Sequence, residues 1–211
     1  MRTDELIAEL SRGPWPTVRP ARRMAAAMFA GWLIALGGLM LIVGQPLAAV
    51  ARTGVAPFGL KLGFTLALAI ISTLAALAAG RPGQHLGPRL ALISLPFLVI
   101  AVVAAIELTS VDPAGRQPLL FGTSFRSCLT AVTLSCVPVL AGTMWAYRVL
   151  APTRPTLAGF LAGLSSGAAA AVAYALYCTE TTASFLLAAY TPAILIPAVA
   201  GALLGPRILR W

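Results

Sequence analysis

The feature that most constrains this chain is a series of long apolar segments separated by short polar ones. A helix of about 20 apolar residues is long enough to cross the hydrocarbon core of a membrane. Hydrophobic residues make up 59% of the 211 residues and charged residues only 10%, which excludes a water-soluble globule and an intrinsically disordered chain. The long apolar segments occupy residues 24–44, 60–79, 90–108, 128–150, 157–178 and 184–205. We therefore expect an all-α fold, an integral membrane six-helix bundle.

The basic residues predict how such a bundle is oriented. Eleven of the fifteen Lys and Arg residues fall on the side of the two termini, and four fall on the other side. The positive-inside rule places the basic side in the cytoplasm, so both termini are expected to be cytoplasmic. The chain then divides into a cytoplasmic leader (1–23), a membrane domain (24–206) and a cytoplasmic tail (207–211).

The motifs of the common enzyme classes do not occur in this sequence. The only histidine, His85, falls in the second connection, where a solvated loop residue is expected. There is no phosphate-binding Gly-x-x-x-x-Gly-Lys-Ser/Thr loop, and the three cysteines form no Cys-x-x-Cys pair. We therefore expect a protein that is not an enzyme and carries no cofactor.

The cysteines are the residues best suited to covalent chemistry or metal binding. Because the fourth and fifth segments are joined by a short turn centred near Thr153, Cys128 and Cys178 lie 25 residues on either side of it and reach the same extracytoplasmic level. They are candidates for a structural disulfide, a redox switch or a soft-metal site, which would need Glu180, Glu107, a backbone group or water as further ligands. Inert small side chains are the alternative, and we expect that role for Cys136, which lies deeper in the fourth segment.

Two other patterns concern packing within the bundle. Gly159, Gly163 and Gly167 repeat every four residues, as do Gly201 and Gly205, and such stripes let a neighbouring backbone approach closely. Prolines inside the segments are expected to kink their helices. They are Pro96, Pro138, Pro192 and Pro197.

The leader contains a second candidate site. Thr3 can cap a short helix that Gly13 and Pro14 end, and Leu6, Ile7 and Leu10 form one apolar stripe on it. A helix this short is marginal alone in water, so it is expected to order against a protein groove or a membrane surface. Acidic residues such as Asp4 on its polar face favour a protein groove over anionic lipid.

Several segments together resemble the NrsF family. They are the leader run Thr-Asp-Glu-Leu-Ile, Phe125-Arg-Ser-Cys128, the turn Ala-Pro-Thr-Arg-Pro-Thr, Tyr174-Ala-Leu-Tyr-Cys178, and the ending Leu-Leu-Gly-Pro-Arg-Ile-Leu-Arg-Trp211. The NrsF family consists of six-span anti-sigma factors of the bacterial inner membrane, negative regulators of the extracytoplasmic-function (ECF) sigma factor SigF. The similarity runs over essentially the whole chain.

The resemblance implies a mechanism and its partners. The leader, with Asp4, Leu6, Ile7 and Leu10, would hold a SigF-like sigma factor at the lipid bilayer, without direct contact to nucleic acid. Cys128 and Cys178 would help to sense metal or oxidative stress, through a soft metal ion or an oxidant, and so release the sigma factor. Cys136 has no counterpart in the family pattern.

One alternative remains open at the level of sequence. A small-solute or metal-ion transporter would use Glu107, Cys128 and Cys178 as ligands and the kinked helices as gates. The alternative interpretation of Glu107 is an acidic residue at the membrane interface, whose carboxylate extends toward the headgroups or pairs with an arginine. No charged pair falls in the middle of a segment, which weakens transport.

Overall fold

The computed structural model describes residues 20–44, 54–81, 84, 86–150 and 152–209, together with residues 5 and 8. This part of the chain contains helices and no strand. Six helical stretches are long and apolar enough to span a membrane, which confirms the all-α, six-helix expectation. The elements are α2 (Pro20–Val43), α4 (Val55–Ala79), α5 (Gly87–Thr109), α6 (Pro113–Phe121), α7 (Phe125–Leu150), α8 (Pro155–Ala175), α9 (Ala183–Phe185), a π-helical turn η1 (Leu186–Tyr190) and α10 (Thr191–Ile208). The leader residues Asp4, Leu6, Ile7 and Leu10 lie outside the described residues.

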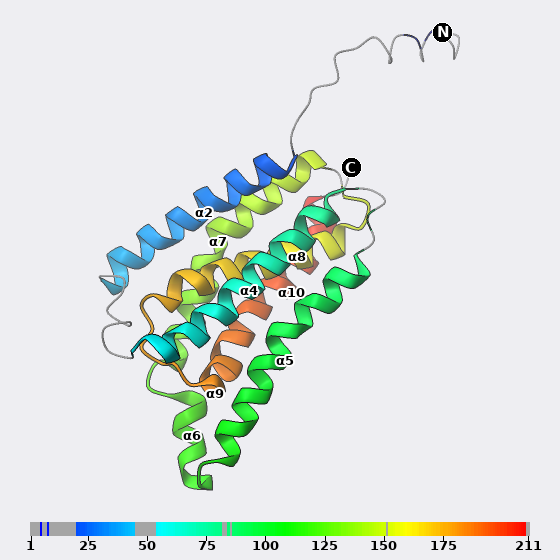
Figure 1. Ribbon diagram of the computed structural model, residues 1–211. Helices are drawn as coiled ribbons and strands as arrows, with labels where there is room; N and C mark the ends of the chain where they lie inside the picture. The colour runs from blue at the N-terminus through cyan, green and yellow to red at the C-terminus, as the bar shows by residue number, and fades with distance from the viewer. Residues whose placement is uncertain are drawn as a thin grey trace.

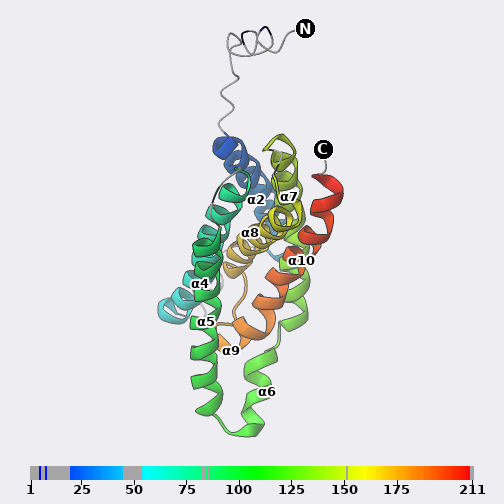
Figure 2. The same cartoon turned by 90° about the vertical axis from the view of Figure 1, so that its right-hand side faces the viewer.

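Helix α8 forms the centre of the bundle. It is the most deeply buried of the six long helices, and α4, α7 and α10 all pack against it. Helix α2 lies along α7 at one edge, and α5 lies along α4 at another (Figure 1). Figure 2 shows α5 and α6 projecting beyond the other helices at one end. The small side chains of α8, mainly Ala, Gly and Ser, explain why it can be surrounded on several sides.

The two glycine stripes face each other between α8 and α10. A Cβ atom added at Gly159 would overlap the carbonyl oxygen of Gly201, and one added at Gly163 would overlap that of Pro197. These two backbones are therefore in direct contact, as the small-residue spacing predicts. The stripe joins α8 to α10, so it does not draw α8 toward the cysteine-bearing helix α7.

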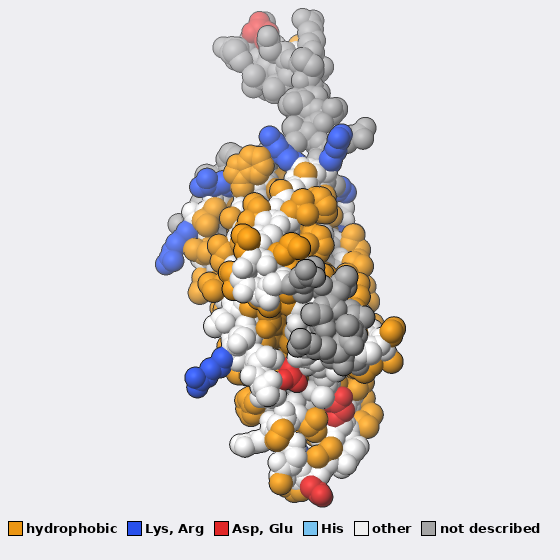
Figure 3. Space-filling view, turned by 90° about the vertical axis from the view of Figure 1, so that its left-hand side faces the viewer, with side chains coloured by type: hydrophobic (Ala, Val, Ile, Leu, Met, Phe, Trp, Pro, Cys, Tyr) orange, Lys and Arg blue, Asp and Glu red, His pale blue; other side chains and the backbone are white. Residues whose placement is uncertain are grey.

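Charged side chains differ between the two ends of the bundle. We call the end where α2 begins and α10 finishes the arginine end, because arginines from four helices and two connections gather there (Figure 3). They are Arg22, Arg23, Arg81, Arg89, Arg148, Arg154 and Arg207. We call the opposite end, with α6 and residues 176–182, the cysteine end. Glu107, Asp112 and Glu180 lie toward it.

Three helices differ from the sequence prediction. Helix α4 begins at Val55 rather than near residue 60, so Lys61 lies in its second turn. Residues 113–121, which lie between the predicted segments 90–108 and 128–150, form a further helix, α6, because Pro113 suits a first helical turn. The sixth segment contains the turn η1 directly before Pro192, which cannot donate to the preceding turn and so favours such a π-helical distortion.

Candidate functional site

The structure brings Cys128 and Cys178 together at the cysteine end. Cys128 lies in the first turn of α7, and Cys178 lies just beyond the end of α8. Both are buried, neither is in a disulfide, and they lie close enough to influence each other electrostatically. The Ser124 hydroxyl, one turn before Cys128, lies 3.9 Å from the Cys178 sulfur. The equal heights predicted from the helical hairpin thus correspond to neighbouring positions in the structure.

A lysine lies next to this pair. Lys61 of α4 is 0% exposed, and its Nζ atom donates hydrogen bonds to the carbonyl oxygens of Cys178 and Glu180, the second at 3.1 Å. The ammonium also lies 5.6 Å from the centre of the Phe58 ring, on the same helix. Burying a charge is costly unless it is paired or hydrogen-bonded, and the two carbonyls provide part of that compensation.

Glu180 fastens the same stretch of chain to the start of α7. Its Oε1 atom accepts hydrogen bonds from the backbone N–H of Thr123 at 3.0 Å and from the Thr123 hydroxyl at 3.1 Å. The neighbouring Gly122 has a φ of +49°, and a Cβ atom there would lie 2.7 Å from the Glu180 carboxylate. Glycine at this position therefore permits both the backbone turn and the close approach.

The surroundings of Cys178 alter its acidity. Its pKa lies below the ordinary value because the Cys128 thiol donates a hydrogen bond to its sulfur, an effect that outweighs desolvation by burial. The Lys61 ammonium and the Glu180 backbone N–H lower it further. The hydroxyl of buried Tyr190, which has no hydrogen-bond partner in the part of the chain that the structure describes, also lowers the pKa of Cys178. Cys178 is therefore the more thiolate-like member of the pair.

Glu107 has a structural role that the sequence did not predict. Its two carboxylate oxygens accept hydrogen bonds from the backbone N–H groups of Ala183 and Ser184 at 2.9 and 2.8 Å, at the start of α9. The Ser184 hydroxyl donates to the same carboxylate at 2.9 Å. A negative charge at free N–H groups is favourable. Glu107 therefore pairs with no arginine among the residues that the structure describes, and it is only partly exposed. Its carboxylate is hydrogen-bonded to the start of α9 instead.

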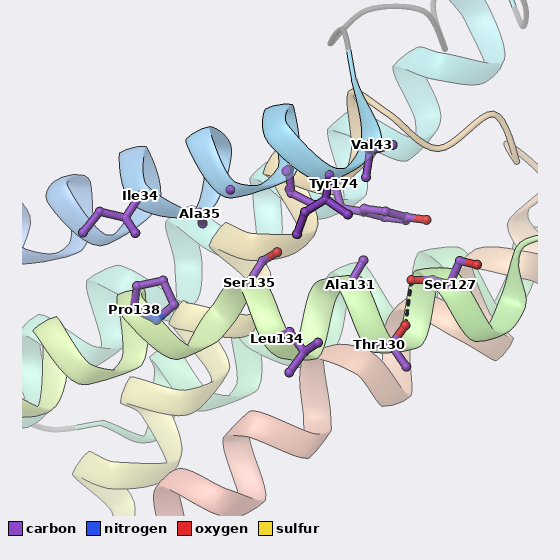
Figure 4. A pocket seen from close by; sticks show the side chains of 13 residues that line it. Ile34, Ala35, Val43, Ser127, Thr130, Ala131, Leu134, Ser135, Pro138 and Tyr174 are labelled. Carbon is purple, nitrogen blue, oxygen red and sulfur yellow. Dashed lines mark hydrogen bonds between the residues drawn. The ribbon is translucent and has the colours of Figure 1, made fainter.

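A groove lies beside the pair, between α2 and α7. It has a volume of about 590 Å³, and Figure 4 shows Tyr174 pointing into it opposite Ser127 and Ala131. Ser127 and Tyr174, which line the groove, lie close in sequence to Cys128 and Cys178 respectively. No charged side chain lines the groove, so it contributes no ionic ligand to the pair.

The candidate metal ligands do not form a full coordination set. Within the described ranges, no three His, Cys, Asp or Glu side chains gather as a metal site. Cys136 lies apart and donates to the Thr133 carbonyl at 3.0 Å, as suits a small buried side chain. Lys61 was not predicted as a site residue from the sequence, where it counts only as one of the four basic residues on the side opposite the termini. The available signal was a lysine between Phe58 and Phe64 in an otherwise apolar run.

Comparison with known proteins decides the family. A family model described as negative regulator of sigma F, NrsF, matches residues 10–211. The chain belongs to the NrsF family. This NrsF chain is 38% identical to the "Probable anti-sigma-F factor NrsF" of Azospira oryzae and 36% identical to the "Anti-sigma-F factor NrsF" of Caulobacter vibrioides. Both alignments cover 100% of this chain and of the relative. No solved structure matches it.

Membership of the NrsF family confirms the resemblance found in the sequence. The family is one of negative regulators of a sigma factor, which is a regulatory role and not an enzymatic one. The partner implied for an NrsF protein is a sigma factor.

Proposed function

We propose that this NrsF protein is a membrane-bound anti-sigma factor that sequesters an ECF-type sigma factor at the bacterial inner membrane. Family membership over the whole chain is the observation that carries this proposal. Six apolar helices of spanning length support the membrane location. The gathering of arginines at one end supports an orientation with both termini in the cytoplasm, where a sigma factor is found.

The leader is the proposed holding segment. Leu6, Ile7 and Leu10 form its apolar stripe, and Asp4 adds an acidic group beside it. Because α2 begins at the arginine end, this orientation puts the leader on the same side as the sigma factor. An amphipathic segment of this kind suits a hydrophobic groove on a soluble partner.

The Cys128–Cys178 pair is the proposed sensor of metal or oxidative stress. Two buried thiols that lie close together can form a disulfide, and thiolate character makes Cys178 a nucleophile and a soft-metal ligand. Modification of the two cysteines rearranges the helices and lowers the affinity of the leader for the sigma factor. Lys61 belongs to α4, Cys128 belongs to α7, and Cys178 follows α8, so a change at this site acts directly on three helices.

Transport has no comparable support. Glu107, one of the three ligands that a transporter would need, already accepts hydrogen bonds at the start of α9. We therefore propose no transport role.

Co-purification from detergent-solubilised membranes tests sequestration. The chain would be compared with a Leu6→Ala, Ile7→Ala, Leu10→Ala variant and with Ile70→Ala, Leu98→Ala, Leu203→Ala, a matched control at exposed, lipid-facing positions. A sigma factor identified by mass spectrometry should accompany the chain and the control but not the leader variant. Equal recovery with all three, or with none, would contradict the proposal.

Stress induction tests the sensor. A Cys128→Ser, Cys178→Ser variant should hold the sigma factor and lose most induction of sigma-dependent transcription by a soft metal or a thiol oxidant. Cys136→Ser is the matched control, because Cys136 is also buried but lies outside the pair. Normal induction in the double variant would rule out sensing by these cysteines.

A further inference from the structure

The connection between α8 and α9, residues 176–182, is fastened to the bundle by a small set of polar contacts. Glu180 bonds to Thr123 before α7, and the Thr182 hydroxyl donates to the Leu119 carbonyl of α6 at 3.2 Å. Lys61 is the side chain that holds the backbone of Cys178 itself. The position of the reactive residue therefore depends on a contact from α4.

Packing alone does not explain a lysine at position 61. Lys61 is fully buried, although a leucine or methionine would fill similar space without the cost of desolvating a charge. Its stem follows α4, and its ammonium group reaches the one non-helical stretch that carries a cysteine of the pair. Lys61 thus joins α4 to the non-helical stretch that carries Cys178.

We propose that Lys61 passes the state of the Cys128–Cys178 pair to the bundle, because it holds residues 176–182 on α4 while the thiols are reduced and loses that hold when they bond. This inference rests on the proposed function. It makes Lys61 a positioning residue rather than a reacting one.

The chemical step itself moves Cys178. Diamide, an azo compound and two-electron oxidant, takes two electrons and two protons from the two thiols and becomes a hydrazine while the S–S bond forms. The two sulfurs must then approach to about 2.05 Å. Cys128 lies within α7, whereas Cys178 lies beyond the end of α8, where its N–H donates to the Tyr174 carbonyl at 3.1 Å. Cys178 is therefore the residue expected to move, and its carbonyl moves with it relative to Lys61.

Transcription from a sigma-dependent promoter tests this role in cells that carry the full chain. Lys61→Met should raise transcription without stress about tenfold or more, since a hydrogen bond to a charged group is lost from the resting state. Lys61→Arg, which keeps the charge and the donors, should restore most of the repression. Thr65→Val is the matched control, because Thr65 is buried one turn away and its hydroxyl bonds only within α4. Unchanged repression in Lys61→Met would overturn the inference.

Hydrogen exchange on the purified chain in lipid nanodiscs gives a second test, and its comparison of reduced with oxidised wild type does not depend on how the variant folds. Amides of residues 176–182 should exchange faster after diamide in the wild type, and reduced Lys61→Met should resemble the oxidised wild type. Equal exchange before and after oxidation would overturn the inference. Wild-type sigma-factor retention and release, measured in parallel, show separately whether the proposed function fails.

Discussion

The two ends of the bundle use charge in different ways. At the arginine end, charged groups contact neutral partners: Arg23 stacks over Trp145, Arg89 donates to the Gln84 side chain at 3.4 Å, and Arg148 donates to the Ile208 carbonyl at 3.4 Å. Arg23 and Arg148 are exposed, and Arg89 is partly exposed. Their charge therefore suits interaction with water and lipid headgroups.

At the cysteine end, charges hold the backbone together instead. Lys61, Glu107 and Glu180 each hydrogen-bond to backbone groups distant in sequence, and all three act around residues 176–184. The partly buried contacts of Lys61 and Glu107 are worth more than exposed ones, because one partner left buried without the other is costly. The comparison suggests that arginines orient the protein, while the other charges position the thiol pair.

The largest expected difference between the ends is their accessibility. In a chain with its three cysteines changed to serine, Gln117→Cys at the cysteine end should react in intact cells with a membrane-impermeant maleimide, and Gln84→Cys at the arginine end should not. Both positions are exposed. Labelling of Gln84→Cys alone would reverse the orientation inferred from the arginines.

Removal of one charge from each end should give unequal losses of stability. Glu107→Ala should lower the free energy of unfolding by about 3 kcal/mol, because the N–H groups of Ala183 and Ser184 lose a charged acceptor. Arg154→Ala should change it by less than about 0.5 kcal/mol. Thermal or denaturant unfolding in detergent measures both, and equal losses would remove the distinction between the ends.

A smaller effect is expected from the backbone at the cysteine end. Gly122→Ala should cost about 2 kcal/mol, since φ is +49° and the new methyl group would press on the Glu180 carboxylate. Gly37→Ala in α2 has nothing within 4 Å of the added atom and should be neutral or stabilising by less than about 1 kcal/mol. The same unfolding assay distinguishes them, and a neutral Gly122→Ala would weaken the case for a tightly held Glu180.

A further effect, confined to one residue, is expected in the pH dependence of alkylation at Cys178. A lowered pKa means that the thiolate persists at lower pH, so the midpoint of the reaction with iodoacetamide should lie below the ordinary thiol value of 9.0. Cys128→Ala removes the hydrogen-bond donor and should move the midpoint up toward 9.0. Mass spectrometry of the Cys178 peptide gives the rates, and coincident profiles would show that Cys128 does not tune its partner.

Patterns that are local in the sequence predicted much of this protein. Runs of apolar residues fix six helices, because each run must bury its backbone polar groups within itself if it lies in a membrane. The short turn between α7 and α8 fixes the relative heights of Cys128 and Cys178, because an α-helix advances by a constant rise per residue. The ordered motifs along the chain were enough to indicate the NrsF family, which the family match confirms.

Contacts between distant segments were decided only by the tertiary structure. Lys61 and Cys178 are 117 residues apart, and Glu107 and Ser184 are 77 apart, so no local spacing links them. Each of these residues has an ordinary reading in the sequence: a basic residue near a helix end, or an acid at an interface. Helix packing alone determines which charge meets which backbone group, because the same helices in another arrangement would present different carbonyls and N–H groups to the same side chains.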